Sequence, residues 1–379
     1  KISKDQPMAN RYILADFEAL KEKNFIAEYF NFKDIDYDFI PPADSTPLVD
    51  QLAERIKGKQ NVYFIFDPNT TLRRLYLEKS RYNNFLDIGI KHNLILMSKQ
   101  DGNELFNTLS NIRANDPELA NWIDSMAPFV FIEGFAGGFH HNNYKNCKFI
   151  NLFHPFLEPK YNITHLHGSK KHRPDKDFFC LMIEKQSTRP HRNLLNQKII
   201  DNDLEKNAIY RFGPLTSDTF KDLGSHYQQR LLDLNPNDQG WLDSALPPIH
   251  YYNRTNFELV VESNTRHNND DSFFFTEKTF KPIALKHPFI ILSNYNHLRN
   301  LHELGFKTFH NHIDESYDSK TDVNDRIDII VRNLKALENN SSTFYKETKY
   351  ITEHNYNHIQ LLHGRWKLDL WNKLDEFWN

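Results

Sequence analysis

The chain has 379 residues, a formal net charge of −3, 39% hydrophobic residues and 14% aromatic residues. The length suits two domains better than one compact core, and the apolar content excludes a disordered chain. The slight negative charge disfavours a protein that coats nucleic acid, and two distant cysteines exclude a disulfide framework. No apolar run reaches the roughly 20 residues that span a bilayer, and no signal peptide is recognised, so we expect a cytoplasmic protein without a transmembrane segment.

The N-terminal half alternates strand-like and helix-like segments. Short apolar runs rich in β-branched and aromatic residues predict strands at 11–17, 61–67, 92–98, 128–134 and 147–153. Between them, helical spacing of apolar residues predicts helices near 47–56, 72–83 and 102–111. Strands that alternate with helices in this way predict a parallel α/β sheet.

A glycine-rich segment follows the predicted strand 128–134. Glu133 lies at the end of this strand, and several glycines and His140 come shortly after it. Glycines after a strand end let the backbone approach a ligand closely, and a carboxylate or imidazole there can take a proton from a substrate hydroxyl. We therefore take Glu133 first, His140 second and Asp67 third as candidate general bases. The alternative is that Glu133 is a buried structural carboxylate and that the glycines only turn the chain.

Residues 154–177 are polar, basic and proline-containing, which predicts a connection between two domains. A second α/β unit follows, and its elements are predicted from the same periodicities. They are strands at 178–185 and 207–213, a strand–helix–strand unit within 257–292, helices near 297–305 and 325–337, and a helical tail over 344–379.

Arg189, His191 and Arg192 stand where a loop after the strand 178–185 enters a helix. Arginine suits bidentate recognition of phosphate, and the helix N-terminus adds a partial positive charge. We expect Arg189 and Arg192 to bind a diphosphate, with His191 positioning them. A solvated basic turn is the alternative reading of the same residues.

The segment 257–292 carries the most specific pattern in the chain. Polar residues flank the loop between its first strand and its helix: Glu262, Ser263, Asn264, Thr276, Glu277 and Lys278. In such a unit, ligands bind at the carboxyl ends of the strands, beside the helix N-terminus. A carboxylate there can accept from ribose hydroxyls and an ammonium can face a diphosphate, so the pattern predicts a nucleotide site. A solvated Glu-Lys pair that complements the helix dipole is the alternative.

This segment resembles the donor-binding motif of the α1,3-fucosyltransferases, in which a strand ending in Phe-Glu-Asn precedes a loop, Thr-Glu-Lys, an apolar helix and a strand. It is also similar to phage and bacterial proteins that carry Thr-Glu-Lys before a Lys-Pro pair. The resemblance implies that Glu277 holds the ribose and Lys278 the phosphates of a GDP-fucose-like donor. Where the family has Asn after the strand Glu, this chain has Ser263, with Asn264 one place further on.

The same resemblance implies the GT-B architecture, with two Rossmann-like domains and a C-terminal helix that packs back on the first domain. We place an N-terminal acceptor domain at 1–165, a C-terminal donor domain at 166–345 and the helical tail at 346–379. The tryptophans of the tail are predicted to pack against the N-terminal domain rather than to stack on a sugar.

No residues with a recognised metal-binding spacing stand out. The nineteen histidines include no His-Glu-x-x-His pattern, and Asp34, Asp36 and Asp38 follow no predicted strand, unlike the metal-binding Asp-x-Asp of other transferases. We therefore expect no metal ion and no cofactor besides the donor. Arg and Lys side chains would then stabilise the leaving diphosphate.

The predicted function is that of an inverting, metal-independent glycosyltransferase. It would move a sugar from a nucleotide diphosphate sugar to a hydroxyl acceptor, with a glycan as the default partner. One alternative is a phage-type transferase that modifies a nucleic-acid base extruded into its cleft. Another is a non-catalytic protein that binds a nucleotide or a glycan. The sequence predicts no oligomeric state.

Overall fold

The computed structural model describes residues 12–16, 24–40, 48–57, 62–66, 93–97, 111–118, 120–121, 129–133, 148–153, 162–182, 189–212, 249–263, 265 and 275–378. Contacts divide the chain into two units, residues 1–153 with 367–379 (unit 1) and residues 154–366 (unit 2). Among the described residues, each unit contains one sheet of parallel strands. The protein is therefore of the α/β class, with Rossmann-like units.

The sheet of unit 1 has the order β2-β1-β3-β4-β5-β6 among its described strands. Their bounds are β1 Tyr12–Asp16, β2 Asp36–Ile40, β3 Val62–Phe66, β4 Asn93–Met97, β5 Phe129–Glu133 and β6 Lys148–Phe153. The five predicted strands are confirmed to within one residue at each end. The edge strand β2 was not predicted, because its aspartates interrupt the apolar pattern. The predicted helix 47–56 is confirmed as α3 (Leu48–Ile56), whereas 72–83 and nearly all of 102–111 lie outside the described residues.

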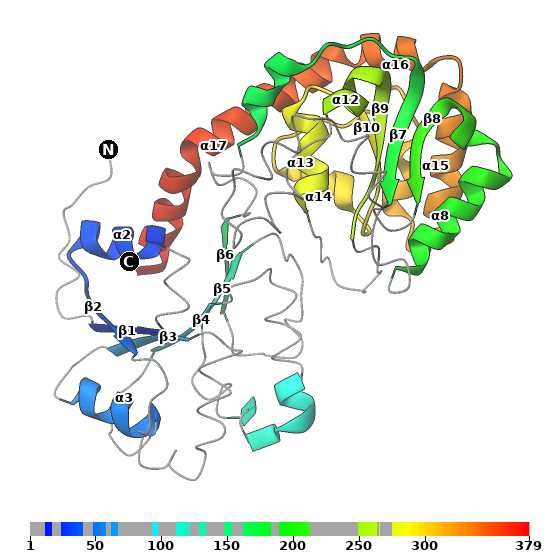
Figure 1. The fold of residues 1–379 in the computed structure, drawn as a ribbon. Coiled ribbons are helices and arrows are strands. Elements are labelled where there is room, and N and C mark those ends of the chain that lie inside the picture. Colours follow the sequence, from blue (N-terminus) through cyan, green and yellow to red (C-terminus); the bar gives the residue numbers. More distant parts are fainter. Residues whose placement is uncertain are drawn as a thin grey trace, which may run out of the picture. The chain divides into compact units, whose positions relative to one another are not determined.

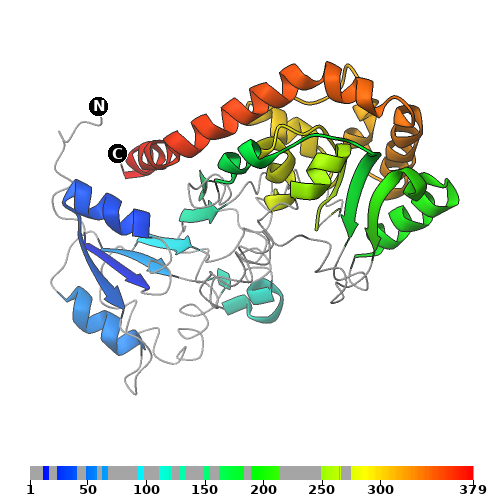
Figure 2. The same cartoon turned by 45° about the horizontal axis from the view of Figure 1, so that its top comes forward.

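Helix α2 (Asn24–Lys33) contacts the last part of α17 (Lys349–Trp378) within unit 1. The ring of Trp371 lies 6.0 Å from that of Tyr29 and 4.8 Å from that of Phe32, measured between centroids. The Asp375 carboxylate accepts from the Tyr29 hydroxyl at 2.8 Å and pairs with Lys33 at 2.6 Å. The predicted packing of a tail tryptophan is thus confirmed for Trp371. Figure 2 shows α17 as one continuous helix.

The sheet of unit 2 has the order β10-β9-β7-β8. Its strands are β7 Lys176–Met182, β8 Ala208–Phe212, β9 Thr255–Val261 and β10 Phe289–Leu292. Every residue of β9 is buried, as expected for a central strand covered on both faces. Phe179 of β7, together with Tyr251, Tyr252 and Leu285, forms an aromatic-rich cluster beside these strands.

The helices of unit 2 follow the predicted periodicities closely. Predicted helices are confirmed as α8 (Pro190–Asp201), α13 (Glu277–Ala284), α14 (His297–Glu303) and α15 (Val323–Leu337), and the tail forms α16 (Ser341–Glu347) and α17. The short elements η5 (Thr164–Ser169), η7 (Leu204–Asn207), α12 (Ile249–Arg254) and η8 (Glu315–Ser319) were not predicted.

Gly305 follows α14 with φ +91°, and a Cβ there would lie 2.6 Å from the His358 ring. Only glycine fits both that backbone angle and that close approach.

Helices cover both faces of the unit 2 sheet. Crossovers between parallel strands are right-handed, and α8 leads from β7 to β8 while α13 leads from β9 to β10 in the opposite direction across the sheet. The two helices therefore lie on opposite faces. Figure 1 shows α8 beside α15 on one side of the strands and α13 with α14 on the other. Lys198 of α8 pairs with Asp328 of α15 at 2.8 Å.

Candidate functional site

The strand order of unit 2 changes direction between β7 and β9. From β7 the chain moves through α8 to β8 at one edge, and from β9 it moves through α13 to β10 at the other. In open α/β sheets, ligands bind at this point of reversal, beyond the carboxyl ends of the two strands. The N-termini of α8 and α13 both contact Glu262, the residue after β9, and they carry Arg189 and the 276–278 segment singled out in the sequence.

Glu262 follows β9 directly and is fully buried. One carboxylate oxygen accepts from the Thr276 backbone N–H at 3.1 Å and from the Thr279 hydroxyl at 2.6 Å. The other accepts from the Thr276 hydroxyl at 2.6 Å and from the Ser263 backbone N–H at 3.3 Å. A carboxylate has about four acceptor sites, and all are occupied by groups of the chain itself. Glu262 therefore holds the start of α13 against the end of β9, and it has no acceptor left for a ribose.

Thr276 caps α13, as predicted, and its hydroxyl accepts from the Lys278 backbone N–H at 3.2 Å. The Lys278 ammonium lies 2.6 Å from the Glu277 carboxylate, 3.3 Å from the Thr276 hydroxyl and 3.4 Å from the Ser263 hydroxyl. The side chain of Lys278 is 27% exposed and that of Glu277 is 11% exposed. The ammonium thus lies at the helix N-terminus, above the strand end, and remains partly accessible. The two groups assigned to phosphate and ribose form an ion pair with each other.

The electrostatic balance around Glu277 favours its ionised form. Burial raises the pKa of the Glu277 carboxyl, but the neighbouring Lys278 and Lys281 together lower it by more than burial raises it. The net effect is a pKa below the usual value. Burial lowers the pKa of the Lys281 ammonium, although Glu277 opposes that shift. At the helix start, Lys278 is therefore the partly exposed cation, paired with Glu277, whereas Lys281 lies in the last turn of α13.

The segment at the start of α8 is divided between surface and core. Arg189 is half-buried at the N-cap position, before Pro190. Arg192 is only 2% exposed, so its guanidinium belongs to the interior. His191 is 6% exposed, and its Nε2 lies 3.3 Å from the Glu262 carbonyl oxygen. Burial lowers the pKa of His191 to about 4, so it is neutral at pH 7 and ties α8 to the end of β9. Of the two arginines, Arg189 is the one placed to reach a ligand.

A buried polar network behind the site was not predicted from the sequence. The Thr279 hydroxyl, which donates to Glu262, lies 3.2 Å from His297 Nε2, and His297 Nδ1 lies 2.8 Å from the Ser293 hydroxyl. Arg326 is 1% exposed. Its guanidinium donates to the carbonyls of Ser293, after β10, and of Thr265, after β9, the latter at 2.8 Å. These contacts fix the ends of both strands.

A second carboxylate lies in β9 itself. Glu258 is 8% exposed and accepts from the Tyr252 hydroxyl at 2.6 Å. Burial raises the pKa of Glu258. The sequence signal that could have found it was a glutamate inside an otherwise apolar strand, four residues before Glu262 and therefore on the same face.

Lys170 contacts the opposite end of α13. Its ammonium donates to the carbonyls of Leu285 and Lys286 at 3.2 Å and 3.4 Å and lies 3.0 Å from His287 Nδ1. Burial lowers the pKa of Lys170 to about 7. His287 is fully buried, and burial lowers its pKa well below the usual value. This cluster caps the helix C-terminus and lies at the amino ends of the strands, away from the point of reversal.

The candidate bases of unit 1 are only partly described. Glu133 is the last residue of β5, and the pairing of β5 with β6 shifts register between Ile132 and Glu133. Such bulges are frequent next to active sites. His140, Asp67 and Asn264 lie outside the described residues. In the strand order of unit 1 the reversal lies between β1 and β3, and Asp67 is the first residue after β3. Which of these residues serves as a base stays a prediction.

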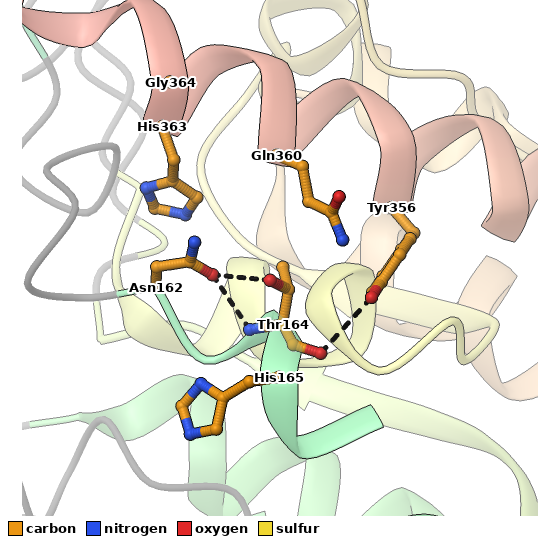
Figure 3. A pocket seen from close by; sticks show the side chains of 7 residues that line it. All are labelled: Asn162, Thr164, His165, Tyr356, Gln360, His363 and Gly364. Carbon is orange, nitrogen blue, oxygen red and sulfur yellow. Dashed lines mark hydrogen bonds between the residues drawn. The ribbon is translucent and has the colours of Figure 1, made fainter. Parts of the chain in front are cut away.

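A pocket of about 490 Å³ opens between η5 and α17, within unit 2. It is lined by Asn162, Thr164, His165, Tyr356, Gln360, His363 and Gly364, shown in Figure 3. None of the residues predicted for the donor site lies among them.

Comparisons of the chain with protein-family models, with curated proteins and with solved structures gave no match. Within the described residues, no group of three or more His, Cys, Asp or Glu side chains could hold a metal ion. In the same residues, no helix is both long and apolar enough to cross a membrane.

Proposed function

We propose that the protein is a glycosyltransferase that uses a nucleotide diphosphate sugar, with the donor bound at the carboxyl ends of β7 and β9. The observation that carries the proposal is the convergence of two helix N-termini, with Lys278 and Arg189, at the reversal of strand order in unit 2. Helix N-termini and cations together favour a diphosphate. The resemblance of this segment to the α1,3-fucosyltransferase motif supports GDP-fucose as the first donor to test.

In the proposed reaction, the acceptor oxygen forms a bond to the anomeric carbon while the bond from that carbon to the diphosphate oxygen breaks. A base takes the acceptor proton, and the departing diphosphate carries the negative charge. Lys278 and Arg189 would stabilise that charge as it develops, which is the role a metal ion has in other transferases. Inversion at the anomeric carbon follows from a single displacement. A glycan hydroxyl is the proposed acceptor.

The Glu277–Lys278 pair supports a specific exchange on binding. The Lys278 ammonium is held at 2.6 Å by Glu277, and a diphosphate would compete for it as a second anion. Glu277 would then turn its carboxylate to ribose hydroxyls. Glu262 would contribute by fixing the position of α13, since its acceptor sites are filled by the chain.

The proposal is tested by calorimetry with GDP, UDP, ADP and the corresponding nucleosides. Lys278→Ala should weaken binding of the preferred diphosphate by roughly 10- to 150-fold, the value of one hydrogen bond to a charged group. Binding of the nucleoside should stay within a factor of two or so of wild type, because it has no phosphate. Lys335→Ala, an exposed lysine on α15, is the matched control. Undiminished diphosphate affinity in Lys278→Ala would exclude the assignment.

Catalytic competence is tested separately by release of the nucleoside diphosphate from a panel of nucleotide sugars, beginning with GDP-fucose. Slow hydrolysis without an acceptor, lost in Lys278→Ala and kept in Lys335→Ala, is expected. Tight diphosphate binding without any turnover of the panel, with or without glycan acceptors, would instead indicate a non-catalytic nucleotide-binding protein.

A further inference from the structure

The pocket between η5 and α17 is lined by polar groups. Among the described residues that line it, none is a carboxylate, a lysine or an arginine. Its side chains offer two amides, two imidazoles, a phenol and a hydroxyl. Amides, hydroxyls and neutral imidazoles each combine donor and acceptor capacity. The volume of about 490 Å³ is within the range of small-molecule sites.

Several of these side chains are fixed by contacts with one another and with Lys286. Asn162 Oδ1 accepts from the Thr164 backbone N–H at 3.0 Å and from the Thr164 hydroxyl at 2.6 Å. The Tyr356 hydroxyl donates to the Thr164 carbonyl at 3.4 Å, and the Lys286 ammonium lies 4.4 Å from the Tyr356 ring centroid. In Figure 3 the Asn162 amide nitrogen points towards His363, and Gln360 projects from α17 on the same side. Asn162, Thr164 and Tyr356 are therefore oriented in advance, which lowers the entropic cost of binding.

Gly364 provides a second, independent observation. It lies inside the 30-residue helix α17, where glycine is the least favourable residue after proline. A Cβ at Gly364 would meet no atom within 4 Å. Gly305, by contrast, is required by its positive φ and by the close approach of His358. No packing constraint of that kind requires glycine at 364, which is exposed and lines the pocket.

From these observations we propose that the pocket binds a neutral carbohydrate unit. Vicinal hydroxyls of a sugar both donate and accept, as do the amides of Asn162 and Gln360 and the imidazoles of His165 and His363. The missing side chain of Gly364 gives room for the ring. The site lies in unit 2, shares no residue with the donor site, and its binding is measured without nucleotide, so the inference does not rest on the transferase activity.

The test uses the methyl glycosides of glucose, galactose, N-acetylglucosamine and fucose at millimolar concentration, with binding followed by saturation-transfer NMR and calorimetry on the full chain. At least one glycoside should bind saturably. Gly364→Leu, which adds a large side chain to the pocket lining, should weaken this binding by roughly ten-fold or more, whereas Gly364→Ala should keep binding and raise the melting temperature. Circular dichroism checks that each variant is folded.

If Gly364→Leu does not fold, a second pair gives the same comparison. Gln360→Ala removes an exposed amide that lines the pocket, and Asn357→Ala removes an exposed amide of α17 that does not. Weaker glycoside binding in Gln360→Ala, with unchanged binding in Asn357→Ala, supports the proposal. Failure of all four glycosides to bind, or equal affinity in Gly364→Leu, overturns it. Saturable binding of inorganic phosphate that Gly364→Leu abolishes would show that the pocket binds an anion, and it would overturn the proposal of a neutral carbohydrate ligand.

Discussion

Glu262→Gln is the sharpest test of the buried carboxylate that connects β9 to α13. The substitution keeps the shape and one oxygen, but it places an amide nitrogen against groups that are themselves donors. If the nitrogen replaces the oxygen that faces the Thr276 hydroxyl and the Ser263 N–H, the Thr276 hydroxyl cannot simply reverse, because its oxygen already accepts from Lys278. In the other orientation the nitrogen faces the Thr276 N–H. Either way one strong bond to a charged acceptor is lost and a buried donor is left unpaired, which costs about 2–4 kcal/mol.

The assay is hydrogen exchange of the peptide covering 275–284, together with urea unfolding at pH 7. A loss of about 2–4 kcal/mol should speed exchange of these amides roughly 30- to 900-fold where opening requires release of α13 from β9. The control is Glu303→Gln, which removes an exposed carboxylate paired with Arg299 at 3.2 Å and should change stability by less than about 0.5 kcal/mol. If Glu262→Gln behaves like the control in both measurements, Glu262 does not hold this helix in place.

Three further outcomes are expected. The unfolded chain keeps the Lys170 proton up to about pH 10.4, whereas burial lowers the pKa of Lys170 to about 7 in the folded protein. Between these two pH values the unfolded state binds more protons than the folded state. The free energy of unfolding therefore rises with pH in this range. Lys170→Met should reduce that slope by up to about 1.4 kcal/mol per pH unit in urea titrations from pH 7 to 9, and an unchanged slope would contradict the burial argument. Transferase turnover should survive excess EDTA, and a complete loss restored by Mn²⁺ would refute metal independence. Glu133→Gln should lower turnover about 10²–10⁴-fold with donor affinity kept, while a near-normal rate would direct attention to Asp67→Asn and His140→Ala.

The sequence predicted the elements of the fold well where a local pattern determines them. The strand that opens the segment 257–292, the cap at Thr276 and the helix after it follow from apolar runs and capping chemistry. The structure has the cap and the helix where expected, and its strand β9 begins earlier, at Thr255. Strand β2 was missed because Asp36 and Asp38, both exposed, occupy alternate positions of this edge strand and interrupt the apolar pattern. Helix α12 was missed because six residues carry too little periodicity to detect.

The candidate site was predicted at the level of its segment but not of its individual roles. Glu262 and Lys278 flank the same loop, and the sequence therefore predicted that both bind the donor. In the structure Glu262 is a buried carboxylate bonded to the chain itself, whereas Lys278 is a partly exposed cation. Arg192 likewise lies in the interior although its pattern indicated a surface ligand. Arg326 contacts Ser293, 33 positions away in the chain, and His297 contacts Thr279, 18 positions away. No local sequence pattern predicts contacts over such separations.

The division of the chain also bears on the order in which it folds during synthesis. All of unit 2, with its sheet and the start of α17, is translated before Trp371 and Asp375, the residues that cover Tyr29 and pair with Lys33. Domains generally fold as units as they leave the ribosome, so unit 2 can become native while α2 still lacks its partners. Until the end of α17 has been synthesised, Tyr29 and Phe32 of α2 lack their contact with Trp371 and form an uncovered aromatic surface on the nascent chain. Any fragment of unit 1 made as a contiguous piece would keep that surface permanently.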